Sequence, residues 1–362
     1  MPYYASLRGE PEPTQKRVAE GLIRLRSGLK ASGVPVRTVS GEILIASWNI
    51  REFDSPKYGE RLVDAFYYIA EVISHFDLVA VQEVNADLRA LDRIQSILGG
   101  WWKYVVTDVT AGSGGANERM AFIYDSRTVA FGGLAGEIVL PPSKVDSEVL
   151  QFARTPFVCG FKSGWAKFDL CTVHIYYGDS KPLEPRRLEE IRKLADFLAK
   201  RAARPGQPAR PDGKVTAVRN TGPDNLILLG DFNIFDPADA TMTALTDAGF
   251  IVPEPLKKRG GSNIAKDKYY DQIAIWRDRH RLEEGEEGGV FDFYDFVFRL
   301  GDAELYAPLM APTKSGKTPR YKEWRTHQMS DHLVLWASFK VDQADQYLQD
   351  LAGGEALAPD PE

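Results

Sequence analysis

Six segments of the chain combine an apolar run with a carboxylate, an amide or an imidazole at or near one end. They are ASWNI (46–50), VAVQEV (79–84), CTVHI (171–175), ILLGDFN (227–233), YYDQIAI (269–275) and MSDHLVLW (329–336). A single strand-end Asp usually caps a turn, and a single His near a strand is usually structural. The chain has only five histidines, however, and both His174 and His332 fall in this pattern. We therefore expect these strand ends to form one site of chemistry.

The residue types in these segments suit one kind of chemistry. Glu83 and Asp331 are hard oxygen donors, and Asn49 adds a neutral oxygen. This set favours Mg²⁺ or Mn²⁺ over zinc, because no cysteine-rich or histidine-rich spacing is present. A divalent ion neutralises phosphoryl oxygens, and a His–Asp pair can activate water. The pattern therefore predicts hydrolysis of a phosphate ester.

Composition sets limits on the class of protein. The 362 residues are 44% hydrophobic and 27% charged, which is typical of a globular protein with a full core. The net charge of −6 argues against a protein that holds nucleic acid mainly by a broad basic surface. It is compatible with an enzyme whose cationic site is local and includes a metal ion. No apolar run approaches the roughly 20 residues that a membrane span needs.

The two cysteines, Cys159 and Cys171, lie in a segment that is typical of a hairpin turning near Ser163 and Gly164. They could face each other across the hairpin, because the sequence does not fix the register. We interpret them as buried free thiols, which favours a reducing cytoplasm. The N-terminus lacks the apolar stretch of a secretory signal. A secreted chain whose signal has been removed is the alternative.

The elements that must position these residues alternate along the chain. Strands are expected at 42–50, 77–84, 102–108, 119–125, 128–133, 157–164, 167–177, 225–233, 269–276 and 333–339. Helices are expected at 14–32, 60–76, 86–98, 184–203 and 236–250. Many short strands with interspersed helices indicate two packed sheets with helices outside. We expect one catalytic domain (41–341), an N-terminal helical arm (1–40) and a frayed acidic C-terminal tail (342–362).

The motifs as a set resemble those of the endonuclease/exonuclease/phosphatase superfamily, and are most similar to its pancreatic-type deoxyribonuclease branch. The matching motifs, in order, are WNIREF, QEV, NERMAFIYD, RTPF, TVHIYYGD, GDFN, YDQI and SDH, between about residues 43 and 340. QEV or GDFN alone would mean little, but the ordered set is specific. The resemblance implies an α/β fold, the four-layer α/β sandwich, with two packed mixed sheets flanked by helices.

The resemblance also implies roles for individual residues. Glu83 would bind the metal, Mg²⁺ or Mn²⁺, with help from Asn49 and Asp331. His332 would pair with Asp271 beside the scissile phosphate.

A second His–carboxylate pair would be formed by His174 and Glu118. Asp231 and Asn233 of GDFN would orient the attacking water and bind the phosphoryl group. Arg154 of RTPF would contact phosphate, because a guanidinium fork fits two oxygens. Arg51 is the weaker candidate for the same task.

Two positions depart from the deoxyribonuclease pattern. That branch has an arginine and a tyrosine that reach into the DNA minor groove, where this chain has Asn85 and Ala116. The segment GGWWKY (99–104) and the basic and aromatic segment 314–328 could compensate with aromatic and basic groups. The second, with Tyr321 and Trp324, would suit a single strand or a small anionic substrate. The alternative for this segment is a solvated loop.

Three hypotheses follow. The first is a deoxyribonuclease-like endonuclease that cleaves phosphodiester bonds and prefers single-stranded or distorted nucleic acid over intact duplex. The alternative is a phosphatase or phosphodiesterase acting on a small or lipid phosphate ester. A catalytically inactive binding module is disfavoured, because no member of the catalytic set is missing. The sequence gives no prediction for the oligomeric state.

Overall fold

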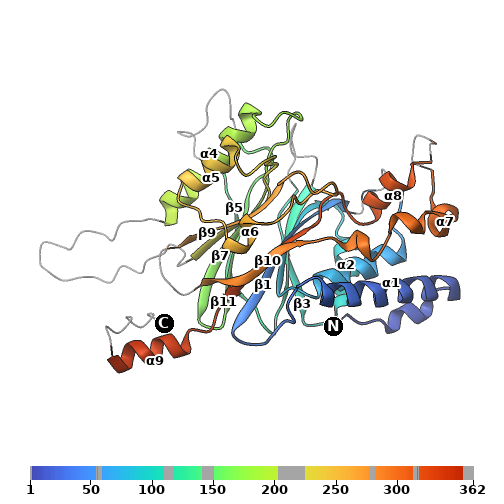
Figure 1. Cartoon of the computed structure of the whole chain (residues 1–362), viewed down its shortest axis with the longest axis horizontal. Coiled ribbons are helices and arrows are strands. Elements are labelled where there is room, and N and C mark those ends of the chain that lie inside the picture. Colours follow the sequence, from blue (N-terminus) through green and yellow to red (C-terminus); the bar gives the residue numbers. More distant parts are fainter. Residues whose placement is uncertain are drawn as a thin grey trace, which may run out of the picture.

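The computed structural model describes residues 2–53, 55, 59–109, 118–140, 151–202, 225–277, 282–312, 316 and 318–353. Its strands form two mixed sheets (Figure 1). The six-stranded sheet has the order β10 (Glu283–Phe291), β11 (Val334–Lys340), β1 (Glu42–Phe53), β2 (Leu78–Asn85), β4 (Glu118–Asp125) and β3 (Trp102–Val106). The five-stranded sheet has the order β5 (Ala130–Glu137), β6 (Phe157–Ser163), β7 (Ala166–His174), β8 (Asn225–Asp231) and β9 (Asp271–Arg277).

The sheets pack face to face, and helices cover their outer faces (Figure 1). Helices α1 (Glu12–Ala31), α2 (Val63–Ile73) and α3 (Arg89–Leu98) lie over the six-stranded sheet, and α4 (Pro185–Ala202) and α5 (Ala240–Asp247) over the five-stranded sheet. The sequence of strand β1 explains why both faces of its sheet are covered, because its side chains are apolar on both. Ile43 and Ile45 face the other sheet, whereas Leu44 and Trp48 face the helices. The predicted four-layer α/β sandwich is confirmed.

Parallel neighbours bring the polar strand ends together. Strand β1 runs parallel to β2 and pairs Asn49 with Gln82, while β7 runs parallel to β8 and pairs His174 with Asp231. Strand β9 then places Asp271 opposite Asp231. Chain ends of neighbouring parallel strands lie at one edge of a sheet, so the polar ends recognised in the sequence meet there.

The glycine of GDFN is required by the packing of β7 on β8. Gly230 has φ +139°, and a Cβ at this position would lie 2.2 Å from the carbonyl oxygen of Val173. Only glycine tolerates both the conformation and the close approach. This close pairing fixes Asp231, the next residue, beside His174.

The hairpin containing the cysteines forms as expected, from β6 and β7. Cys159 packs between the two sheets, and Cys171 packs under the helices on the other face of the same sheet. Both are buried free thiols. Burial raises the pKa of Cys159 to about 12, which makes this thiol unreactive near neutral pH.

Several elements differ from the sequence-based expectation. Strand β10 was not predicted, because its four glutamates and three glycines do not show the alternation of an amphipathic strand. Residues 344–353, expected to fray, form helix α9 (Ala344–Gly353), and Tyr347 packs its ring on Trp165. The remaining short helices are η1 (Ala5–Gly9), α6 (Glu254–Lys257), η4 (Phe293–Asp295), η5 (Leu300–Asp302), α7 (Ala303–Tyr306), η6 (Ala307–Leu309) and α8 (Tyr321–Gln328).

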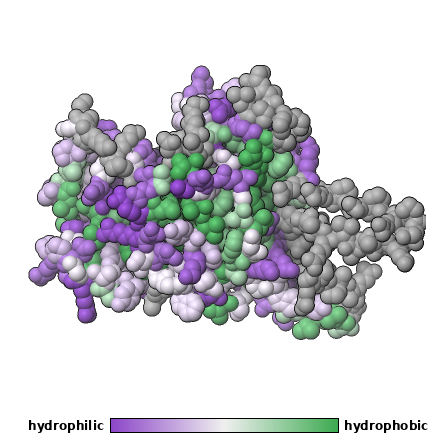
Figure 2. Space-filling view, turned by 180° about the vertical axis from the view of Figure 1, so that it is seen from behind, coloured by the Kyte–Doolittle hydropathy of each residue, from purple (hydrophilic) through white to green (hydrophobic). Residues whose placement is uncertain are grey.

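The surface mixes polar and apolar groups. Hydrophilic residues cover much of the described part of the face opposite to that in Figure 1, with apolar residues between them (Figure 2). Among the described helices, none has the length and apolar character needed to cross a membrane.

Candidate active site

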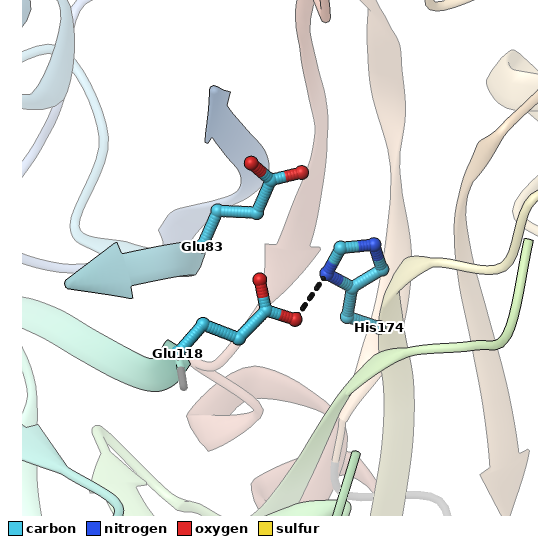
Figure 3. A group of neighbouring side chains, drawn as sticks. All are labelled: Glu83, Glu118 and His174. Atoms are coloured by element: carbon cyan, nitrogen blue, oxygen red, sulfur yellow. Dashed lines mark ion pairs between the residues drawn. The ribbon is translucent and has the colours of Figure 1, made fainter. Parts of the chain in front are cut away.

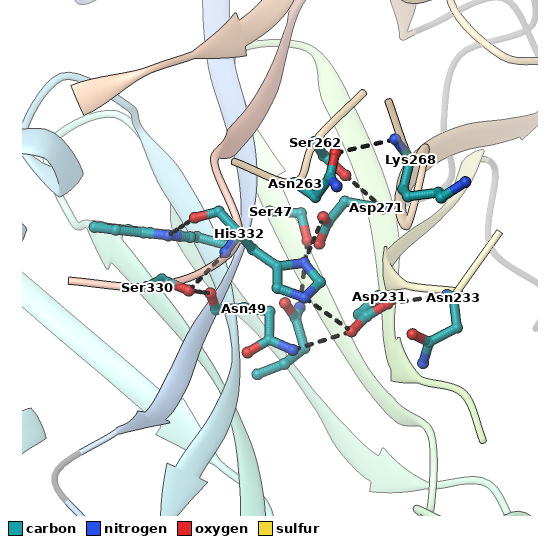
Figure 4. Close-up of polar contacts among 12 residues, drawn as sticks. Ser47, Asn49, Asp231, Asn233, Ser262, Asn263, Lys268, Asp271, Ser330 and His332 are labelled. Atoms are coloured by element: carbon teal, nitrogen blue, oxygen red, sulfur yellow. Dashed lines mark hydrogen bonds and ion pairs between the residues drawn. The ribbon is translucent and has the colours of Figure 1, made fainter. Parts of the chain in front are cut away.

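The first His–carboxylate pair joins the two sheets. His332 precedes β11 of one sheet, and Asp271 begins β9 of the other. His332 Nδ1 lies 2.8 Å from Asp271 Oδ2, and Asp271 is fully buried (Figure 4). The predicted neighbours are therefore in contact.

The second pair lies on the opposite side of the site. His174 Nδ1 is 2.9 Å from Glu118 Oε1, and both side chains are about nine-tenths buried (Figure 3). The guanidinium of Arg154 forms an ion pair with the same carboxylate oxygen. Strand β4, which Glu118 begins, belongs to the six-stranded sheet, so this pair also bridges the sheets.

Asp231 lies between the two imidazoles. Its Oδ2 is 3.5 Å from His174 Nε2 and 3.7 Å from His332 Nε2. Its Oδ1 accepts a hydrogen bond from the backbone N–H of Asn233 at 2.9 Å. The Asn233 amide donates in turn to the carbonyl oxygen of Ile175, just after His174. Asp231 is thus held between the two imidazoles, slightly beyond direct hydrogen-bond distance of either ring.

Glu83 and Asn49 complete the centre. Asn49 Nδ2 donates to Glu83 Oε1 at 2.9 Å and to Asp231 Oδ2 at 3.0 Å. The backbone N–H of Glu52 donates to Glu83 Oε2 at 2.7 Å. Glu83 and Asn233 both adopt left-handed backbone conformations, with φ of +59° and +53°. Such conformations are costly for residues other than glycine and cluster at functional sites.

The two histidines have opposite electrostatic environments. Burial, and then the nearby Arg154 cation, lower the pKa of His174 to about 4. Burial also opposes the charge on His332, but the carboxylates of Asp271 and Asp231 outweigh it and raise its pKa well above the ordinary value. The two environments thus favour opposite protonation states, the neutral imidazole for His174 and the imidazolium for His332.

The donors at the centre fit a divalent cation. Glu83, Glu118 and His174 form one group of possible ligands, and Asp231, Asp271 and His332 form another, each with ligand atoms within 4.8 Å of one another. Asn49 Oδ1 is buried and has no hydrogen-bond partner among the described residues. An unpaired buried carbonyl beside carboxylates is the oxygen-rich environment that Mg²⁺ or Mn²⁺ prefers.

Arg51 and Asp331 lie together on the rim of the site. Arg51 Nε is 3.5 Å from Asp331 Oδ2, and Arg51 Nη1 donates to Thr326 at 2.5 Å. The Asp331 side chain is 44% exposed and belongs to neither group of donors found among the described residues. The metal and phosphate roles expected for these two residues remain predictions.

The basic and aromatic segment does not have the structure that stacking requires. Residues 321–328 form helix α8, and Trp324 is only 3% exposed, packed on Phe298, Tyr306 and Tyr321. Arg325 is also buried, against the ring of Tyr294. The prediction that Trp324 offers a ring to a substrate is therefore wrong. Lys314 and Lys317 lie outside the described residues, as does Ala116.

Two serines that the sequence reasoning did not assign hold the catalytic groups. Ser330 Oγ donates to the carbonyl oxygen of Asn49 at 2.6 Å and accepts from the backbone N–H of His332 at 3.0 Å. Ser262 Oγ accepts a hydrogen bond from the backbone N–H of Asp271 at 3.0 Å. The backbone carbonyl oxygen of Ser262 accepts one from the backbone N–H of Leu333. Ser330 is the serine of the SDH motif, which was a usable signal, whereas GGSN around Ser262 carries none.

Comparison with known proteins identifies the family. Residues 46–332 match the model of the Endonuclease/Exonuclease/phosphatase family, and the chain belongs to that family. The family is named for endonucleases, exonucleases and phosphatases, which hydrolyse phosphoester bonds. Members of the family generally use a divalent metal ion.

One curated relative has a sequence similar to that of this chain. A protein of Thioalkalivibrio sp. (strain K90mix), named Deoxyribonuclease, is 27% identical over 259 residues, or 68% of this chain and 61% of that protein. The chain thus spans about three fifths of the length of this curated relative.

Two solved structures show the same fold. One is a functionally unknown conserved protein from Enterococcus faecalis V583, with TM-score 0.52, 15% identity, and coverage of 83% of this chain and 100% of that chain. The other is an endonuclease/exonuclease/phosphatase family protein from Bacteroides thetaiotaomicron, with TM-score 0.50, 16% identity and coverage of 83% and 95%.

Proposed function

We propose that the chain is a divalent-metal-dependent endonuclease of the deoxyribonuclease type, which hydrolyses internal phosphodiester bonds in nucleic acid. The observation that carries this proposal is the position of Asp231, within 3.7 Å of the Nε2 atoms of two histidines that are each held by another carboxylate. The relative named Deoxyribonuclease supports the choice of substrate class.

In the proposed reaction, water forms a bond to phosphorus and the bond from phosphorus to the leaving oxygen breaks. The water gives up one proton, and the leaving oxygen takes one. Asp231 and Asn233 would orient the water, and His332, positioned by Asp271, would exchange a proton at Nε2. His174 and Arg154 would bind the phosphoryl oxygens from the Glu118 side.

Glu83 and Asn49 are the residues proposed to hold the metal, and Asp331 is proposed to assist from the rim. When bound, a divalent ion supplies positive charge that polarises the phosphoryl group and stabilises the charge of the leaving oxygen. The hydrogen bonds from the backbone N–H of Glu52 and from Asn49 hold the Glu83 carboxylate in place.

The second candidate is a phosphatase or phosphodiesterase that acts on a small or lipid phosphate ester. Asn85 favours it, because this neutral residue lies opposite Glu118 at the site, where the deoxyribonuclease branch has a groove-reading arginine. A duplex therefore lacks one of its expected contacts.

One set of assays separates the two candidates. The protein is incubated with Mg²⁺ and, separately, plasmid DNA, a single-stranded oligonucleotide, RNA, methyl 4-nitrophenyl phosphate and a phosphomonoester. His332→Ala is the control for contaminating nucleases. Internal cuts in nucleic acid support the endonuclease. Release of phosphate from the monoester with no cleavage of any nucleic acid would establish the second candidate instead.

A further inference from the structure

Three aromatic side chains lie side by side next to the proposed catalytic pair. We name Tyr177, Phe235 and Tyr270 the aromatic platform. The rings of Tyr177 and Phe235 are stacked, with centroids 6.2 Å apart at 25°, and Tyr270 packs edge-on against Phe235 at 5.4 Å. The ring of Tyr270 lies 5.6 Å from that of His332. The platform therefore begins at the reacting centre and extends outward from it.

Each platform residue is attached to a strand that carries a site residue. Tyr177 follows His174 by three residues, Phe235 follows Asn233 by two, and Tyr270 immediately precedes Asp271. Small movements of these strands would displace the catalytic groups as well. The platform is consequently positioned by the same backbone as the active site.

A buried arginine fixes the outer part of the platform. Arg187, from α4, is fully buried and donates hydrogen bonds to the carbonyl oxygens of Tyr177 and of Asp179, at 2.9 Å for the latter. Its guanidinium lies 5.5 Å from the ring centroid of Tyr177 and 4.8 Å from that of Phe235. These contacts hold the Tyr177 ring in one orientation.

The exposure of the rings shows which of them can meet a ligand. Phe235 is 6% exposed and forms the base of the platform, whereas Tyr177 is 39% exposed. Phe235, Tyr270 and the Arg187 guanidinium all pack against the Tyr177 ring, and the remaining exposed part of this residue is where a ligand can meet the platform.

A cation lies beside the same rings. Lys268 Nζ is 5.2 Å from the ring centroid of Phe235, and its backbone is tied to Asn263 and Ser262 next to Asp271. Figure 4 shows Lys268 on the Asp271 side of the site. Lys268 is half-buried, so a cation lies at the edge of the platform.

We propose that the aromatic platform is a subsite for an unpaired nucleobase next to the scissile phosphate, with Lys268 contacting a neighbouring phosphate; this rests on the proposed endonuclease function. A base within a duplex has both faces stacked on its neighbours, whereas an unpaired base can place one face on Tyr177. The subsite would therefore select single-stranded or distorted nucleic acid. The platform thus takes the role that the sequence analysis gave to Trp324, which is buried.

The test compares Tyr177→Ala with Tyr177→Phe, which keeps the ring. Trp101→Ala is the matched control. Trp101 is also an exposed aromatic (62%), but it precedes β3, where Trp102 pairs with Asp125 at the end of β4 that is remote from Glu118. This position does not support the expectation that GGWWKY contacts the substrate. Each variant is assayed on a single-stranded oligonucleotide, on the same oligonucleotide with abasic residues flanking the cut, and on methyl 4-nitrophenyl phosphate.

We expect wild type to cleave the base-containing oligonucleotide about tenfold better than the abasic one, in kcat/KM. Tyr177→Ala should abolish this preference, and Tyr177→Phe and Trp101→Ala should keep it. Equal cleavage of the two oligonucleotides by wild type, or an unchanged preference in Tyr177→Ala, would overturn the subsite while leaving the endonuclease intact. Absence of wild-type cleavage of both oligonucleotides and of the small diester would instead refute the proposed function, and the subsite with it.

Discussion

His332 and Asp271 are in contact at 2.8 Å although they are contributed by different sheets. The pair is therefore also a joint of the sandwich. Ser262 strengthens this joint, because it accepts hydrogen bonds from Asp271 N through its hydroxyl and from Leu333 N through its carbonyl oxygen. The packing of the two sheets thus determines the geometry of the proposed catalytic groups.

The pairing predicts strongly non-additive effects on catalysis. His332→Ala and Asp271→Ala should each lower kcat by about 10²–10⁴-fold, the usual range for a positioned acid or base. The double variant should be hardly slower than either single variant, because residues that act as a unit lose their effect together. Single-turnover kinetics with saturating substrate measure the chemical step. If the two losses multiply, the residues act independently and the assignment of a pair is wrong.

The proposed metal site predicts that Glu83→Gln loses metal binding. The variant keeps the size of the side chain but removes the charge that faces Asn49. In wild type, Mg²⁺ should raise Tm, because a ligand that binds only the folded state stabilises it. The increase should disappear in Glu83→Gln, along with hydrolysis.

Glu304→Gln, an exposed carboxylate outside the two donor groups, is the control and should keep the Mg²⁺-dependent increase. A normal increase in Tm for Glu83→Gln would remove Glu83 from the metal site. The same readout applied to Asp331→Asn decides whether the rim carboxylate contributes.

Breaking the ion pair between the N-terminal helix α1 and helix α2 should lower stability strongly. Arg17 of α1 forms a two-pronged ion pair with the buried Asp64 of α2, at 2.6 and 2.8 Å, and Tyr306 donates to the same carboxylate. Arg17→Ala should lower the free energy of unfolding by about 3 kcal/mol, because it leaves a buried charge without its partner. Lys16→Ala, an exposed neighbour, should change it by less than about 0.5 kcal/mol.

Urea denaturation, followed by both circular dichroism and tryptophan fluorescence, measures the free energy of unfolding of each variant. A single cooperative transition that shifts in Arg17→Ala would mean that residues 1–40 unfold together with the catalytic domain. A separate early transition, with the main one unmoved, would support an independent arm.

Asp125 predicts a dependence of stability on pH. Burial alone would raise its pKa, but hydrogen bonds from Arg127 and Arg37 lower it to about 2. Since the folded pKa is below the unfolded value of about 3.9, the ionised pair stabilises the fold above pH 4 and this contribution is lost as pH falls toward 2. At pH 6 the free energy of unfolding of wild type should exceed that of Asp125→Asn by about 1–2 kcal/mol, and this difference should narrow by pH 3. Urea denaturation at each pH measures it. A difference independent of pH would show that the charge of Asp125 is not responsible.

The sequence analysis grouped the polar strand ends into one site, and the structure brings them together. The contact of His174 with Asp231 was not predicted, because it depends on β7 and β8 being parallel neighbours that end at one edge of the sheet. The aromatic platform was not foreseen, since Tyr177, Phe235 and Tyr270 come from three strand ends whose relative rotation no local pattern specifies. Ser262 was missed for the same reason.

The error at Trp324 has a related cause. A tryptophan among basic residues is typical of both a solvated loop and an amphipathic helix, and the partners decide between them. Phe298 and Tyr306, which cover Trp324, come from the region 298–306, where no element was predicted. Because no element was predicted there, the sequence analysis had no apolar surface against which to pack α8.

The last prediction separates a structural tryptophan from a ligand-binding tyrosine. Trp324 is buried among three aromatic rings, so Trp324→Ala should lower the free energy of unfolding by about 3–5 kcal/mol, as large core truncations do. Its folded fraction should still prefer the base-containing oligonucleotide over the abasic one. Tyr177→Ala should show the reverse, a small change in stability with loss of the preference, because the Tyr177 ring is half-exposed. Denaturant titration and the ratio of kcat/KM on the two oligonucleotides give both quantities for each variant. Loss of the preference in Trp324→Ala at full stability would return the substrate contact to α8 and remove it from the platform.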